Sequence, residues 1–186
     1  RVVIVTLDSH LASSVGRAHR LLAAELPGLA LTLHAVAELG EDAAALDRCR
    51  EDIARADIVI ATMLFMEDHI RPVMDALRAR RDRCDAMIGC MSAGEVIKLT
   101  RIGRFTMDGQ QGGAMALLKR LRGAKGGGDK PATPGAQQMA MLRRLPRILR
   151  FIPGTAQDVR AYFLTLQYWL AGSDENVANM VRLLVD

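Results

Sequence analysis

Residues 2–7 read VVIVTL, an unbroken apolar run rich in β-branched side chains, and Asp8 and Ser9 follow it directly. A continuous run of this kind, without alternating polar residues, is typical of a strand that is buried on both faces of a parallel sheet. Aspartate and serine are common at the residue that precedes a helix. The stretch therefore predicts a buried strand that leads directly into a helix, which is the opening unit of an α/β fold.

Amphipathic helices and further apolar runs alternate after this first unit. From Leu11 to Leu26, apolar residues recur every three or four positions, which places them along one side of a helix. Short apolar runs over residues 29–36, 58–61 and 86–89 predict three more strands, with helical stretches between them. This alternation predicts a parallel sheet with right-handed crossovers and helices on both faces. The expected fold is α/β and flavodoxin-like, with about four strands in the order 2-1-3-4.

Three helix starts can be predicted from capping residues. Pro72 lies within a helical pattern, and proline is tolerated in the first turn of a helix, so we expect that helix to begin near Asp68 as its cap. Thr155 and Asp158 have the spacing of a capping box for a later helix. Ser173 is the expected cap of the last helix.

The composition changes twice along the chain and suggests three parts. Residues 1–122 form the expected α/β domain, ending in a helical stretch over 110–122. Residues 123–135, GAKGGGDKPATPG, are dominated by glycine and proline and are expected to form a mobile linker. Residues 136–186 return to helical patterns and are expected to form a C-terminal helical appendage.

Bulk composition excludes some protein classes. The chain has 186 residues, of which 50% are hydrophobic and 25% charged, so it is not an intrinsically disordered protein. No stretch of about 18 apolar residues is present to span a membrane. The three cysteines, Cys49, Cys84 and Cys90, form no C-x-x-C pair, and we interpret them as reduced core residues of a cytoplasmic protein.

The charge balance is basic, with a formal net charge of +4 and an isoelectric point near 9.3. Part of this excess lies in one short segment that holds Arg143, Arg144, Arg147 and Arg150. The segment is either a solvated helix face or a basic surface for an acidic partner. Aromatic residues make up only 4% of the chain, which argues against stacking surfaces for nucleic acid.

Candidate functional residues follow the predicted strands. Ligands of open parallel sheets bind beyond the carboxyl ends of the strands, so we expect any ligand contact there. Asp8 and His10 could act as an acid–base pair, or Asp8 could simply cap the following helix. The methionines that follow the later strands either suit a flat apolar ligand or fill the core. The candidate ligand contacts at this edge are Asp8, His10, Met66, Met91, Ser92 and Glu95.

The stretch GCMSAGE over residues 89–95 resembles a phosphate-binding turn only in part. Ser92 begins an expected short helix through Leu99, whose first amides could bind an anion, but Glu95 would repel a phosphate. Neither G-x-x-x-x-G-K-[ST] nor G-x-G-x-x-G occurs in the chain. Cys90 is either a thiol nucleophile near a helix start or a structural thiol, and no base is identifiable beside it. We therefore predict neither a catalytic residue nor a metal ligand.

Four long segments carry a resemblance to a known family. They are VVIVTLDSHLASSVGRA (2–18), ELPGLALTLHAVAE (25–38), ADIVIATMLFMEDHIRPVMDAL (56–77) and CDAMIGCMSAGEVIKLTRIGRF (84–105). In this order they resemble the N-terminal region of the large, porphyrin-binding subunit of magnesium chelatase, in its bacteriochlorophyll-pathway form. That subunit is itself similar to the large subunit of cobaltochelatase. The chain starts at Arg1 without a methionine, and we expect it to be part of a longer polypeptide.

The resemblance implies a role in a multi-subunit enzyme. The full subunit binds protoporphyrin IX, and insertion of Mg²⁺ requires ATP hydrolysis by separate AAA+ motor subunits. The catalytic groups are expected in the later part of the subunit, so this region is expected to be non-catalytic, without a cofactor of its own. Its implied partners are the remainder of the large subunit, the motor subunits and protoporphyrin IX, whose propionates could meet Arg101 and Arg104.

Without the resemblance, the chain would be a free-standing flavodoxin-like module that binds a small ligand, or a receiver-type module. A receiver needs a phosphoacceptor aspartate at the end of the third strand, where this chain has Ala61 and Thr62. A flavin-binding domain needs a Ser/Thr-rich phosphate loop after the first strand, whereas Ser9, Ser13 and Ser14 are spread along a helix. Both alternatives are less well supported than the resemblance.

Overall fold

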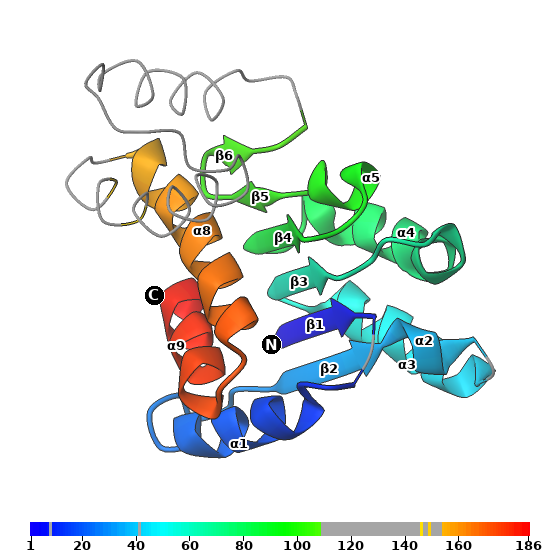
Figure 1. Cartoon of the computed structure of the whole chain (residues 1–186), viewed down its shortest axis with the longest axis horizontal. Helices are drawn as coiled ribbons and strands as arrows, with labels where there is room; N and C mark the ends of the chain where they lie inside the picture. Colours follow the sequence, from blue (N-terminus) through cyan, green and yellow to red (C-terminus); the bar gives the residue numbers. More distant parts are fainter. Residues whose placement is uncertain (8, 41, 109–145, 147–148, 150–153) are drawn as a thin grey trace, which may run out of the picture.

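Four strands of five residues form the centre of the protein: β1 (Val2–Thr6), β2 (Leu31–Ala35), β3 (Ile58–Thr62) and β4 (Ala86–Cys90). The computed structural model describes residues 1–7, 9–40, 42–108, 146, 149 and 154–186. In it these four strands run parallel in the order β2-β1-β3-β4 (Figure 1). Strands β1, β3 and β4 are buried along their whole length, because helices cover both faces. The predicted order and the predicted α/β class are confirmed.

Two very short strands extend the sheet beyond the prediction. Strand β5 (Arg101–Ile102) pairs antiparallel with β4, and β6 (Phe105–Thr106) pairs antiparallel with β5, so the sheet is mixed and six-stranded. Gly103 turns this hairpin with φ of +53°, a left-handed conformation that suits glycine. Strands of two residues show no periodicity, so the sequence pattern did not predict them.

Each face of the sheet has its own set of helices (Figure 1). Helices α1 (Ala12–Leu22), α8 (Thr155–Ala171) and α9 (Asp174–Val185) share one hydrophobic cluster with Ile4 and Ile60. On the other face, α2 (Val36–Leu39), α3 (Ala43–Arg55), α4 (Glu67–Arg81) and α5 (Gly94–Ile97) share a second cluster with Val3 and Val59. The C-terminal helices therefore cover the α1 face of the sheet and belong to its core.

Two of the three predicted helix caps are wrong. Helix α4 begins at Glu67 after Met66, whose carbonyl accepts from the amides of His69 (3.0 Å) and Ile70 (3.1 Å), so Asp68 lies inside the first turn and Pro72 deeper in the helix. Helix α8 follows Gly154 without a side-chain cap.

The expected capping box fails because Asp158 has another partner. Its carboxylate accepts a hydrogen bond from the amide of Arg104 at 3.0 Å, in the β5–β6 hairpin, and so does not return to the start of its own helix. Ser173 is the confirmed cap, since its Oγ accepts from the Asn176 amide at 3.2 Å.

Several sequence predictions lie outside the described residues. They concern the helix over 110–122, the linker 123–135, the division of the chain into 1–122 and 136–186, and most of the basic segment. None of the helices in the described part of the chain is both long and apolar enough to cross a bilayer.

Gly89 in β4 allows helix α5 to pack directly against the sheet. A Cβ atom at this position would lie 2.2 Å from the backbone carbonyl oxygen of Val96. The backbone of Gly89 is also held from the side, because its N–H donates to Thr100 Oγ1 (3.0 Å) and its carbonyl accepts from that hydroxyl (3.1 Å). A side chain at position 89 would therefore push α5 away and break this bracing.

We predict that Gly89→Ala destabilises the protein by at least about 2 kcal/mol, because the clash is with backbone that cannot rotate away. The matched control is Gly16→Ala in α1, where a Cβ meets nothing within 4 Å. There the change should raise stability by about 0.5–1 kcal/mol, as alanine is the better helix former. Urea denaturation followed by circular dichroism measures both, and equal stabilities of the two variants would contradict the prediction.

Candidate functional site

The loops that follow β3 and β4 are tied into one unit at the carboxyl edge of the sheet. The amide of Met63 donates to the carbonyl of Met91 at 3.0 Å, and the amide of Ala93 donates to the carbonyl of Leu64 at 2.7 Å. The buried Ser92 hydroxyl accepts from the Leu64 amide (3.1 Å) and donates to the Cys90 carbonyl (3.0 Å). Ser92, a predicted ligand contact, therefore braces the two loops through its hydroxyl oxygen, while its hydroxyl proton is used within its own loop.

Two methionines in these loops have left-handed backbone conformations. Met63 has φ of 62° and Met91 has φ of 45°, and they are the non-glycine residues with positive φ in the described part of the chain. This conformation is uncommon for a side chain of that size and costs on the order of 1 kcal/mol or more at each site. The hydrogen bonds between the loops offset that cost and fix the direction in which both chains leave the sheet.

The predicted site residues fall on two sides of this edge. His10 is exposed at the α1 side and lies edge-on to Trp169 of α8, with ring centroids 6.4 Å apart, and Met91 packs partly buried against the cluster of that face. Glu95 is the second residue of α5 and Met66 directly precedes α4, and these two helices pack on the opposite face of the sheet. Asp8 lies outside the described residues. The structure thus separates His10 and Met91 from Met66 and Glu95.

Two buried threonine hydroxyls lie at the ends of neighbouring strands. Val5 of β1 pairs with Ala61 of β3, so Thr6 and Thr62 follow next to each other on the α1 face, and both are 0% exposed. Neither hydroxyl makes a hydrogen bond of standard geometry within the described part of the chain, although that of Thr62 lies close enough to the Cys90 thiol to lower the pKa of that thiol. The order of strands reverses between β1 and β3, which is where ligands of open α/β sheets bind. These two residues were not predicted from the sequence, although both end an apolar strand with a polar side chain.

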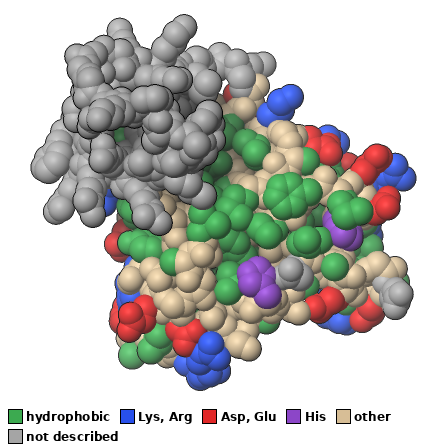
Figure 2. Space-filling model, viewed as in Figure 1, with side chains coloured by type: hydrophobic (Ala, Val, Ile, Leu, Met, Phe, Trp, Pro, Cys, Tyr) green, Lys and Arg blue, Asp and Glu red, His purple; other side chains and the backbone are tan. Residues whose placement is uncertain are grey.

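The face between α8 and α4 is apolar. Figure 2 shows hydrophobic side chains gathered there, with histidine side chains at the rim of the patch. Met66 (58% exposed) and Phe65 (54% exposed) are the most exposed large hydrophobic side chains in the described part of the chain. Exposed apolar surface of this kind is typical of a ligand or partner contact.

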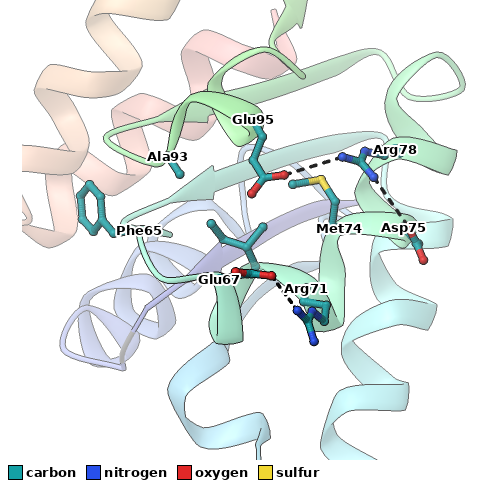
Figure 3. A pocket seen from close by; sticks show the side chains of 9 residues that line it. Phe65, Glu67, Arg71, Met74, Asp75, Arg78, Ala93 and Glu95 are labelled. Atoms are coloured by element: carbon teal, nitrogen blue, oxygen red, sulfur yellow. Dashed lines mark hydrogen bonds and ion pairs between the residues drawn. The ribbon is translucent and has the colours of Figure 1, made fainter.

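A pocket of about 350 Å³ lies between α4 and α5 (Figure 3). Ile70 and Met74 are buried at its base, and Phe65 stands at its mouth. The rest of the lining is Ala93 and five charged side chains, which are Glu67, Arg71, Asp75, Arg78 and Glu95. Of the six predicted contact residues, Glu95 alone lines this pocket.

Arg101, one of the two arginines suggested for propionate binding, is engaged in the fold. Its guanidinium donates to the carbonyl oxygens of Arg81 (3.1 Å) and Cys84 at the end of α4. This ties β5 to the helix and places the positive charge near the helix carboxyl terminus, where it is favourable. Arg101 therefore holds β5 against the end of α4.

The three cysteines are free and buried, as predicted. Burial raises the pKa of the Cys90 thiol from 9.0 to about 11, more than the nearby Thr62 hydroxyl lowers it. Burial raises the pKa of Cys49 to about 12. Because the nucleophile is the thiolate, these thiols are unreactive near neutral pH. The described residues contain no group of three His, Cys, Asp or Glu side chains placed to hold a metal ion.

Comparison with known proteins gives one family. The family model described as "Domain of unknown function (DUF3479)" matches residues 1–163. The magnesium-chelatase H subunit of Cereibacter sphaeroides is 48% identical over 184 residues, and that of Rhodobacter capsulatus is 42% identical over 184 residues. Each alignment covers 99% of this chain and 15% of the relative.

A plant protein matches over the same part of the chain. The chloroplastic magnesium-chelatase protein ChlH of Oryza sativa subsp. indica is 33% identical over 192 residues, covering 99% of this chain and 13% of that protein. The chain therefore spans about one seventh of the length of the curated relatives that it matches.

We predict that Cys90 makes the protein less stable as the pH rises from 9 to 11. The pKa of the thiol is near 9.0 in the unfolded state and about 11 in the folded state, so between these two pH values only the unfolded thiol loses its proton. This proton loss stabilises the unfolded state relative to the folded one. The full effect is about 2–3 kcal/mol. Urea denaturation at pH 8, 9, 10 and 11 should show a shallower loss of stability in Cys90→Ala than in the wild type, and equal slopes would contradict the prediction.

Proposed function

This chain belongs to the DUF3479 family and corresponds to the N-terminal part of the magnesium-chelatase H subunit, and from that premise we propose that it serves as the N-terminal, non-catalytic region of a cytoplasmic magnesium chelatase. The observation that carries the proposal is 48% identity to one such protein across 99% of the chain. The same similarity favours this function over a free-standing flavodoxin-like or receiver-type module.

In the proposed function the intact large subunit binds protoporphyrin IX and receives Mg²⁺ as the second substrate. AAA+ motor subunits hydrolyse ATP to drive the insertion, in chlorophyll and bacteriochlorophyll biosynthesis. The region described here would shape access of the substrate or dock the motor subunits. This accessory role agrees with the local chemistry, because Ser92 braces two loops and burial raises the pKa of the Cys90 thiol.

We further propose that this region contacts the porphyrin from the α1 side of the sheet edge, through His10 and Met91. Trp169 lies edge-on to His10, and the adaptable thioether of Met91 suits the flat face of a tetrapyrrole. At the ends of β1 and β3, Thr6 and Thr62 add two buried hydroxyls on the same face of the sheet. Met66 and Glu95 lie on the opposite face and are left out of this contact.

The proposed function predicts that the intact polypeptide containing this chain forms magnesium protoporphyrin when motor subunits, ATP, Mg²⁺ and protoporphyrin IX are supplied. The product is measured by its fluorescence. Residues 1–186 in place of the intact polypeptide should give no product and no ATP hydrolysis. Absence of product with the intact polypeptide would overturn the chelatase assignment, and product formed by residues 1–186 would overturn the non-catalytic role.

The porphyrin contact predicts that His10→Ala combined with Met91→Ala weakens protoporphyrin binding by the intact large subunit about tenfold, since both side chains would leave the tetrapyrrole face. The measurement is a Soret-band titration, with Met66→Ala as the matched control on the opposite face. A thermal melt separates affinity from folding, because Met91 packs partly against the core. Unchanged affinity in the double variant, or an equal loss in Met66→Ala, would contradict this contact.

A further inference from the structure

The pocket between α4 and α5 has an apolar base and an open aromatic mouth (Figure 3). Ile70 and Met74 are 2% and 4% exposed, so the base is part of the hydrophobic core. Phe65 lines the pocket, and Met66 follows it in the same loop. Because the two side chains at the base offer little accessible surface and most of the exposed lining is polar, an aliphatic stem would find its apolar contacts at Phe65 and Ala93.

The charged residues around this pocket carry a surplus of negative charge. Glu67, Asp75 and Glu95 face two guanidiniums, those of Arg71 and Arg78. The local charge is thus opposite in sign to the net charge of the chain, which is +4. An anionic ligand such as a porphyrin propionate is disfavoured here, whereas a cation is attracted.

The carboxylates differ in how firmly they are paired. Glu67 accepts a hydrogen bond from Arg71 at 2.6 Å, one helical turn away. Glu95 lies 3.7 Å from Arg78, which also reaches Asp75 at 3.9 Å, and both distances are too long for a hydrogen bond. Glu95, whose side chain is 48% exposed, and Asp75, whose side chain is 100% exposed, are therefore less firmly paired than Glu67.

We propose that this pocket receives an arginine or lysine side chain of a partner protein, with the cation bound by Glu95 and the stem packed beside Phe65 and Ala93. Phe65 adds a ring face for the cation and, with Met66, an apolar rim for the residues that flank it. A free small amine would leave this rim uncovered, so the occupant is a protein segment. The inference rests on the proposed function, in which the partner is the AAA+ motor assembly.

The test is binding of the motor assembly to the intact large subunit, measured by surface plasmon resonance at low and high salt. Glu95→Lys should weaken binding at least tenfold at low salt, and the loss should shrink at high salt because the interaction is between charges. Glu95→Gln should act in the same direction, less strongly, and guards against misfolding of the lysine variant. The matched control is Glu51→Lys on α3, a carboxylate 65% exposed and 3.6 Å from Arg55, which lies outside the pocket lining.

Each outcome separates the two proposals. If the wild type forms magnesium protoporphyrin and Glu95→Lys binds the motor within twofold of Glu51→Lys, this inference is overturned and the proposed function stands. A second experiment uses spermidine as a small-amine probe. If spermidine binds the wild type but not Glu95→Lys, and leaves motor binding unchanged, this inference is again overturned and the proposed function stands. A wild type that forms no magnesium protoporphyrin overturns the proposed function, and this inference with it.

Discussion

The backbone of Gly89 is the point where three elements of the fold, β4, α5 and α8, meet. The carbonyl of Val96 in α5 occupies the space that a Cβ would need, and the Thr100 hydroxyl pairs with both the N–H and the carbonyl. Tyr162 of α8 donates its hydroxyl to the same carbonyl at 3.2 Å, from the other face of the sheet. Strand β4 therefore fixes α5 on one face of the sheet and α8 on the other, and with them the positions of both candidate surfaces.

This arrangement divides the carboxyl edge into two surfaces of different character. On the α1 and α8 side, the described groups are neutral and apolar, with buried hydroxyls, an aromatic ring and a methionine. On the α4 and α5 side, carboxylates surround an apolar pocket. The joined β3 and β4 loops lie between them, so the porphyrin contact and the partner contact that we propose would not overlap.

The four long strands and their order could be predicted from the sequence, because fully buried strands such as 2–6 and 58–62 are continuous apolar runs. The carboxyl edge as the ligand site was also predicted from topology, and it stays a prediction. The β5–β6 hairpin could not be predicted, and it determines the start of α8, since Asp158 is bound to the Arg104 amide. The pocket also could not be predicted from the sequence, because its carboxylates come from two helices whose packing depends on the close approach at Gly89.

Several of the arginines that make the chain basic stabilise the fold. Arg80 donates to the carbonyl of Ala56 at 2.7 Å, and Arg81 donates to that of Leu99 at 3.2 Å. Together with Arg101, these side chains satisfy backbone carbonyls at helix and strand ends, which is a structural use of positive charge. The net charge of +4 therefore does not describe the surface that a partner meets, and at the α4–α5 pocket that surface is negative. Recognition by charge depends on which groups remain loosely paired, and at this pocket these are the carboxylates of Glu95 and Asp75.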